Sequence, residues 1–160
     1  MRTKKILKFA ILPVLLMLVA LVVKAGTDND SSDIKNVMDA QETAWNNGDL
    51  DGFMTGYWKS DKVKFVSRNG VTYGWQKVYD NYKKSYPDKA TMGNLAFDII
   101  SIESLDDENF HAVGLGKKNK AYMVTGKWET SNTSKAASGY FTLIFKKING
   151  SWVIVADHTS

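Results

Sequence analysis

The chain has 160 residues, of which 44% are hydrophobic and 24% are charged, as expected for one globular domain rather than for a disordered segment. It contains no cysteine, which excludes disulfide frameworks, thiolate metal sites and cysteine nucleophiles. With only two histidines, His111 and His158, a histidine-rich metal centre is excluded too, and we expect neither a metal nor a cofactor.

The net charge of +4 does not describe the body of the chain. Five of the 21 basic residues and none of the 17 acidic residues lie in 1–25, so the remainder carries 16 basic and 17 acidic residues, a net charge of −1. Because nucleic-acid binding depends on a basic surface, we expect no nucleic-acid partner.

Residues 1–25 have the pattern of a signal peptide. A basic stretch precedes an apolar run from Phe9 to Val23, which is shorter than the roughly 20 residues that a membrane span needs. Cleavage after Ala25 would leave Gly26 as the new N-terminus. We therefore expect a periplasmic or secreted protein, with an uncleaved membrane anchor as the alternative. Residues 26–31 are polar and are expected to form a flexible leader.

Three helices are expected next. Ser32 or Asp33 caps a first helix that runs to about Asn47, with apolar residues at helical spacing. Asp49 caps a short second helix. A third helix follows at 75–86 and ends before Pro87.

The remaining segments are typical of antiparallel strands. A small hairpin is predicted around Asn69-Gly70. Apolar residues alternate to Ile99 and then shift to Ile100 and Ile102, which indicates a β-bulge. The other predicted elements are strands at 63–67, 71–74, 95–102 and 110–129 (one strand or two), a turn at 106–109, a loop at 130–138, and a hairpin of 140–148 with 151–158. Helices followed by strands predict an α+β fold in a single domain, 32–160.

The last hairpin predicts which face of the sheet is the interior. Asn149-Gly150 favours a two-residue turn, and this turn fixes the register of the two strands. The inner face then holds Phe141, Leu143, Phe145, Trp152, Ile154, Ala156 and His158. The outer face holds Tyr140, Thr142, Ile144, Val153, Val155 and Asp157. On this register His158 is the polar residue at the end of an apolar face.

Several motifs, taken in order, resemble one family. They are Ala44-Trp45-Asn46-Asn47-Gly48-Asp49-Leu50, Tyr57-Trp58, Gly74-Trp75, Tyr86-Pro87-Asp88, Met92-Gly93, Gly126-Lys127-Trp128, Gly139-Tyr140-Phe141 and the ending from Trp152 to Ser160. From Ser32 to Ser160 the chain resembles the SnoaL-like branch of the nuclear transport factor 2-like superfamily. The branch that it resembles most is a domain of unknown function related to the association domain of a calmodulin-dependent kinase.

The resemblance implies a cone in which a curved antiparallel sheet wraps around helices and encloses a pocket. It also implies a homodimer through the outer sheet face, where Tyr140, Thr142, Ile144, Val153 and Val155 are expected. The superfamily includes ketosteroid isomerases, polyketide cyclases, dehydratases and binding proteins, so the fold does not choose a function. The Gly114–Lys120 stretch looks longer than the family's strand and would form a lip on the pocket or an elongated hairpin.

The candidate site residues follow from the inner face and the aromatic residues. His158 is a candidate general acid or base, or a ligand-binding group, against the alternative of a structural histidine. Tyr57 is a candidate proton donor. The predicted ligand-binding residues are Trp45, Tyr57, Trp75, Tyr79, Trp128, Phe141 and His158. Asp98 and Asp157 are both expected to face outward, which argues against a ketosteroid isomerase type of site.

These observations leave three functional hypotheses. The first is an exported module that binds a small, largely apolar ligand in an aromatic pocket. The second is a proton-transfer enzyme of the isomerase or the dehydratase and cyclase type, with His158 as acid or base and Tyr57 or Tyr79 as donor. The third is an interaction domain that acts through its outer sheet face. In all three, the membrane is contacted only through an uncleaved signal segment.

Overall fold

The computed structural model describes residues 29–105 and 120–160. The predicted signal peptide, the turn at 106–109, His111 and most of the Gly114–Lys120 stretch lie outside the described residues. The elements are α1 (Asn29–Asn46), α2 (Leu50–Met54), β1 (Lys64–Ser67), β2 (Gly70–Tyr73), α3 (Trp75–Ser85), α4 (Lys89–Met92), β3 (Asn94–Ser104), β4 (Ala121–Ser131), β5 (Ala137–Ile148) and β6 (Ser151–Thr159).

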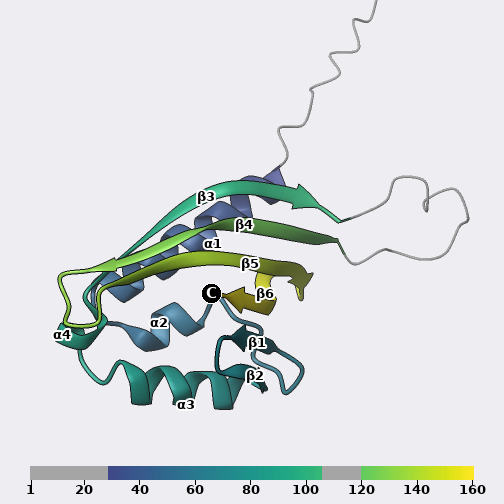
Figure 1. The fold of residues 1–160 in the computed structure, drawn as a ribbon. Helices are drawn as coiled ribbons and strands as arrows, with labels where there is room; N and C mark the ends of the chain where they lie inside the picture. The colour runs from purple at the N-terminus through teal and green to yellow at the C-terminus, as the bar shows by residue number, and fades with distance from the viewer. Residues whose placement is uncertain (1–28, 106–119) are drawn as a thin grey trace, which may run out of the picture.

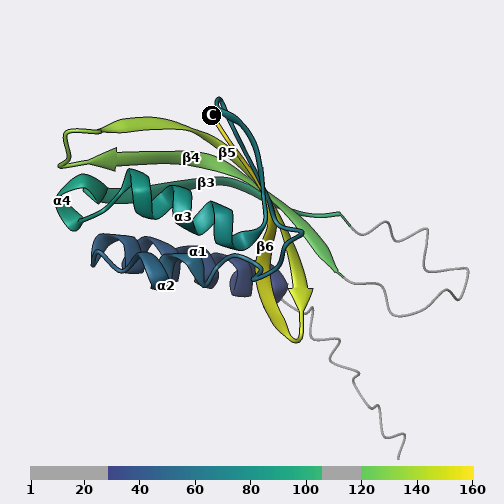
Figure 2. The same ribbon diagram turned by 90° about the horizontal axis from the view of Figure 1, so that it is seen from below.

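The architecture is a curved six-stranded sheet with helices on its concave side, which confirms the predicted α+β fold and cone. The strand order is β2-β1-β6-β5-β4-β3. Figure 1 shows β3, β4 and β5 arching over α1, α2 and α3. In Figure 2 the β5–β6 hairpin turns away from the direction of β3 and β4, which gives the sheet its strong curvature. The pairing is antiparallel except between β1 and β6, which are parallel.

Helix α1 lies along the concave face because its apolar residues recur at helical spacing. Ile34, Met38 and Trp45 are all buried on this side. The helix begins at Asn29, so residues 29–31 of the predicted leader are helical. The reason is Asp30, whose carboxylate pairs with Lys120 and Lys147 and so fixes the first turn against the sheet.

Two bulges bend the sheet. The one in β3 lies between Ile99 and Ser101, so the bulge predicted from the shift in apolar spacing is confirmed. The second lies in β6 and was not predicted. There Phe145 pairs with Ile154 but Ile144 pairs with Ala156, so Val155 is an extra residue without an opposite partner.

The second bulge reverses the end of the predicted register. Beyond Val155, Leu143 pairs with Asp157 and Thr142 pairs with His158. Asp157 therefore points inward and is 3% exposed, whereas His158 points outward and is exposed. The predicted placements of both residues were wrong, because a single inserted residue exchanges the two faces of a strand.

The core fills the concave side of the sheet. It is made of apolar side chains from the helices, from the segment around Tyr57 and Val63, and from the inner faces of β3 to β6. Its largest fully buried members are Phe145, Ile34, Met38, Met54, Met92, Ile154, Val63, Val78 and Val124.

Candidate functional site

A buried polar centre lies at the inner end of β6. The Tyr57 hydroxyl donates a hydrogen bond of 2.6 Å to Asp157 Oδ2, and the Thr159 hydroxyl donates one of 2.6 Å to Oδ1. Tyr57 is placed by the turn after α2, where it forms a parallel bridge with Ile154 of β6. Both carboxylate oxygens of Asp157 are thus held by neutral hydroxyl groups.

Burial dominates the electrostatics of this centre. It raises the pKa of Asp157 from 3.8 to about 6, although the hydrogen bonds from Thr159 and Tyr57 oppose this shift. Burial, followed by the nearby charge of Asp157, also raises the pKa of Tyr57 well above its ordinary value. The centre therefore combines a carboxyl group that takes up a proton near neutral pH with a phenol that remains protonated.

Tyr82 of α3 lies near the centre. Burial, then the charge of Asp157, raises its pKa, whereas a hydrogen-bonding interaction with the Tyr57 hydroxyl lowers it. Its ring lies 5.4 to 6.2 Å, between ring centroids, from four other aromatic rings, those of Trp45, Phe53, Phe65 and Tyr86. Tyr82 thus packs among aromatic side chains from α1, α2 and β1 and beside Tyr86, which follows α3.

The structure brings together only part of the predicted ligand-binding set. Tyr57 belongs to the centre, and Trp45 belongs to the aromatic cluster around it, with its Nε1 bound to the Met92 carbonyl at 3.1 Å. Phe141 is buried on the inner face beside Thr159 in the strand register. Trp128 faces inward on β4 and is half-buried.

The remaining predicted residues lie elsewhere. Trp75 and Tyr79 stack on each other at 5.2 Å on α3, and the Tyr79 hydroxyl binds Asp51 at 2.6 Å rather than Asp157. His158 is exposed on the outer sheet face. The predicted place of His158 inside the cone was therefore wrong. Asp157 occupies the inward position that was expected for His158.

Two residues at or near the centre were missed, for different reasons. Asp157 was assigned to the wrong face because nothing in the sequence around Val155 signals the bulge. Tyr82 was recognised only as part of an apolar helix stripe. The sequence did contain a sign of its role, because a tyrosine in the apolar stripe of a helix needs a polar partner for its hydroxyl.

The indole nitrogens Trp128 Nε1 and Trp152 Nε1 are buried, and neither has a hydrogen-bond partner in the described part of the chain. Each unpaired buried N–H is unfavourable for stability. They lie on the inner faces of β4 and β6, Trp152 packing edge-on against Tyr122 at 5.2 Å.

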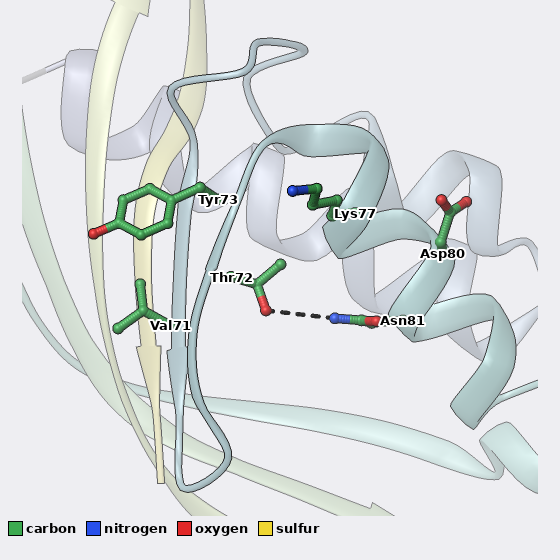
Figure 3. Close-up of a pocket in the computed structure, with 6 residues that line it drawn as sticks. All are labelled: Val71, Thr72, Tyr73, Lys77, Asp80 and Asn81. Carbon is green, nitrogen blue, oxygen red and sulfur yellow. Dashed lines mark hydrogen bonds between the residues drawn. The ribbon is translucent and has the colours of Figure 1, made fainter.

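Two surface hollows among the described residues have linings that do not include Asp157. One, of about 450 Å³, lies between β2 and α3 and is lined by Val71, Thr72, Tyr73, Lys77, Asp80 and Asn81. Figure 3 shows Thr72 and Asn81 facing each other across it, joined by a hydrogen bond of 3.4 Å. The other, of about 230 Å³, lies by α2, α3 and α4 and is lined partly by Tyr79, Tyr86 and Met92.

Two further observations concern metals and membranes. Within 29–105 and 120–160, no three acidic or histidine side chains lie close enough together to hold a metal ion. No helix in these ranges is long and apolar enough to cross a membrane.

Comparison with solved structures identifies the family. An NTF-2 like protein of unknown function from Shewanella oneidensis MR-1 is 37% identical, with a TM-score of 0.71 over 82% of this chain and 98% of that chain. A domain of unknown function with a cystatin-like fold from Nostoc punctiforme is 14% identical, with a TM-score of 0.60 over 84% and 78%. A ketosteroid isomerase-like protein from Erwinia carotovora atroseptica is 15% identical, with a TM-score of 0.55 over 83% and 96%.

No protein-family model matches the sequence, and no curated protein matches it. The two more distant structures show the fold alone. The Shewanella protein shows more, because its identity of 37% extends over 98% of its own length. On this evidence the chain belongs to the nuclear transport factor 2-like (NTF2-like) family.

Proposed function

We propose that this chain binds a small, largely apolar ligand inside the cone, with the Asp157–Tyr57 pair as the polar anchor. The observation that carries the proposal is the Asp157 carboxyl, which is 3% exposed and hydrogen-bonded to two neutral hydroxyls. An aromatic surround with a few convergent polar groups is the usual composition of a small-molecule site.

The energetic cost of Asp157 supports this proposal. Removing a carboxylate from water costs several kcal/mol unless a cation or strong hydrogen bonds compensate. An apolar residue at the end of β6 would stabilise the core without this cost. A buried carboxyl group whose pKa is raised to about 6 is therefore better explained by a functional role than by a contribution to stability.

The second candidate is a proton-transfer enzyme, and the same pair supports it. A carboxyl group with a pKa near neutrality is suited to general acid or base catalysis, and the hydroxyls of Tyr57 and Tyr82 are suited to stabilise an oxyanion. Asp157 replaces His158 as the acid–base group in this version. The two candidates differ in one measurement, since only the enzyme would convert a bound ligand.

Two further parts of the proposal concern location and assembly. The N-terminal segment is proposed to direct export, with cleavage near Ala25 leaving a periplasmic or secreted protein. The outer sheet face is proposed to pair with a second copy of the chain through Tyr140, Thr142, Ile144, Val153 and Val155. Tyr140 is 62% exposed on this face.

The test of binding uses Nile red, a neutral apolar dye whose fluorescence increases in an apolar site. We expect saturable binding that Asp157→Asn and Tyr57→Phe each weaken by about tenfold, the equivalent of one lost hydrogen bond. His158→Gln and Tyr140→Phe are the matched controls, because they change the adjacent outward residue and an exposed tyrosine. Equal affinities in all five proteins would show that the dye binds elsewhere and would contradict the proposal.

A further inference from the structure

The two edges of the sheet differ in how their backbone groups are satisfied. The edge strands are β3 and β2. At β3, helix α1 takes the place of a neighbouring strand: Asn46 bonds both the N–H and the C=O of Leu95, and Glu42 accepts from the Phe97 N–H at 2.8 Å. At β2, no side chain in the described part of the chain bonds to a backbone group. The edge of β2 is therefore open to a further strand.

The pairing of β2 with β1 determines which of its backbone groups are free. The Gly74 N–H donates to the Val63 carbonyl at 2.9 Å, so Gly74 is a bonded position. Bonded and non-bonded positions alternate along an antiparallel pair, which makes Thr72 the next bonded position. Val71 and Tyr73 consequently direct their N–H and C=O groups away from β1, toward the free edge.

The hollow of about 450 Å³ between β2 and α3 lies beside these free groups. Figure 3 shows Val71 and Tyr73 on one side of the strand and Thr72 on the other, facing Asn81 of the helix. The bond between Thr72 and Asn81 is long, at 3.4 Å, so little is lost if it opens. Val71 and Tyr73 are 52% and 56% exposed, which leaves apolar surface next to the edge.

The hairpin and α3 carry a concentrated positive charge. Residues 59–84 contain seven basic and two acidic residues, a net charge of +5, in a body whose net charge is −1. All seven basic side chains are exposed, and none of them forms a salt bridge within 29–105 and 120–160. They are Lys59, Lys62, Lys64, Arg68, Lys77, Lys83 and Lys84.

Two of these lysines lie at the open edge itself. Lys64 is paired with Tyr73 across the hairpin, and Lys77 lines the hollow. Asp80 also lines the hollow, and its Oδ1 accepts a bond of 2.9 Å from Gln76. A surface of this sign attracts an acidic partner and repels the same edge of a second copy of the chain.

We propose that the free edge of β2 binds an acidic peptide segment of a partner protein, which adds to the sheet as a further strand beside α3. Backbone bonds to Val71 and Tyr73 supply the pairing, and alternate side chains of the segment contact the apolar surface and Lys77. The site is separate from the interior one, because the lining of the hollow includes neither Asp157 nor Tyr57.

The test uses a fluorescein-labelled peptide of six residues in which Glu and Val alternate, and measures its binding by fluorescence anisotropy at low salt. Two control peptides separate charge from strand pairing. In one, Lys replaces each Glu. In the other, each Val is N-methylated, which keeps the charge but removes the N–H groups that pair with an edge. We expect the acidic peptide to bind about tenfold more tightly than either control.

Charge reversal on α3 tests where the peptide binds. Lys77→Glu and Lys83→Glu change the net charge equally, but Lys83 lines the other hollow, by α2 and α4. We expect Lys77→Glu to weaken binding of the acidic peptide about tenfold and Lys83→Glu to weaken it less than about twofold. Equal effects of the two reversals would show diffuse attraction and would overturn the proposed location.

A backbone variant tests the edge from the side of the protein. Val71→Pro removes an N–H that points away from β1, so the hairpin keeps its own bonds, and binding should weaken about tenfold. Val71→Ala keeps this N–H and should bind more tightly than Val71→Pro. If Val71→Pro does not fold, the N-methylated peptide tests the same pairing on the unaltered protein. Equal affinity of the N-methylated and the parent peptide would identify a general polyanion surface and would refute strand addition.

Discussion

Tyr57 and Asp157 lie 100 residues apart in the chain, and the hydroxyl of the first donates a 2.6 Å hydrogen bond to the carboxylate of the second. The bond joins the turn after α2 to the last strand. It forms only because the extra residue Val155 rotates Asp157 from the outer to the inner face of the sheet. A bulge that redirects one side chain in this way is a common device near functional sites.

The raised pKa of Asp157 predicts a specific dependence of stability on pH. Folding raises the pKa from 3.8 to about 6, so the folded state retains a proton that the unfolded state loses as pH rises. The free energy of unfolding contributed by this group is therefore greatest below about pH 4 and falls as pH rises to about 6, by about 3 kcal/mol. Denaturation by urea at several pH values measures it.

The matched comparison for this prediction is Asp157→Asn, which keeps the size of the side chain and cannot ionise. The wild type should lose about 3 kcal/mol of its free energy of unfolding, relative to the variant, when the pH is raised from about 4 to about 7. The comparison is repeated with His158→Gln in both proteins, which removes the neighbouring imidazole. A difference that stays constant with pH would contradict a raised pKa of Asp157.

The fold was predictable because its signals are local and repeated. Helical spacing identified α1 and α3, Asp49 was confirmed as the cap of α2 through its bond to the Gly52 N–H, and Asn149-Gly150 identified the last hairpin. The short helix α4 and the parallel pairing of β1 with β6 were not predicted. The parallel pair depends on contacts between distant segments, which no local pattern records.

The candidate site was less predictable because it depends on one residue of register. The alternation of apolar residues in β6 gave the correct inner face from Trp152 to Ile154 and the wrong one beyond the bulge. The bulge in β3 was visible because it shifts an apolar pattern at Ile99 and Ile100. The bulge at Val155 leaves no such sign, because the residues after it, Ala156, Asp157 and His158, do not continue an alternating apolar pattern.

Asn46 is predicted to protect the edge of the sheet. Its side-chain amide donates to the Leu95 carbonyl at 2.9 Å and accepts from the Leu95 N–H at 2.7 Å, as a neighbouring strand would. Asn46→Ala leaves both groups of this edge strand unpaired and should lower the free energy of unfolding by about 2 kcal/mol, measured by urea denaturation.

Two variants make this prediction specific. Asn46→Asp retains an acceptor for the Leu95 N–H but loses the donor, so a smaller loss of about 1 kcal/mol is expected. Asn36→Ala, at an exposed position of the same helix, should change stability by less than about 0.5 kcal/mol. Equal effects of the substitutions at 36 and 46 would show that helix propensity alone explains them.

Asp30 is predicted to stabilise the start of α1 through its charge. Its side chain is 9% exposed and pairs with Lys120 and Lys147, and the hydrogen bond from Lys120 is the main cause of its lowered pKa. Asp30→Asn should lower the free energy of unfolding by about 1 kcal/mol at neutral pH and low salt. This effect should shrink in 1 M NaCl, because salt screens the half-exposed lysines.

The exposed pair Lys35–Asp39, with an Nζ to Oδ2 distance of 2.7 Å, provides the control for Asp30. Asp39→Asn should cost less than about 0.5 kcal/mol, because both partners are in water. The lowered pKa of Asp30 also predicts that its contribution is lost as pH falls below about 4. If the effect of Asp30→Asn on stability is unchanged by salt and by acid, the prediction is contradicted, and Asp30 stabilises the helix through packing and not through its charge.

The outer sheet face provides the last prediction, which concerns assembly. Tyr140, 62% exposed on β5, is flanked in the register by Lys127 of β4, and Thr142 is paired with the outward His158 of β6. We expect the chain from Gly26 onward to sediment as a dimer at about 10 micromolar. Tyr140→Arg should convert it to a monomer, since an added cation beside Lys127 and its symmetry mate would be left in an apolar interface.

Ala40→Arg is the control for this experiment, because Ala40 is exposed on α1, on the opposite side of the sheet. It should leave the dimer intact and the melting temperature nearly unchanged. A wild-type chain that sediments as a monomer at this concentration would contradict the proposed pairing. His158 would then be an exposed residue on a free surface, and the function of the protein would lie entirely with Asp157 and its neighbours inside the cone.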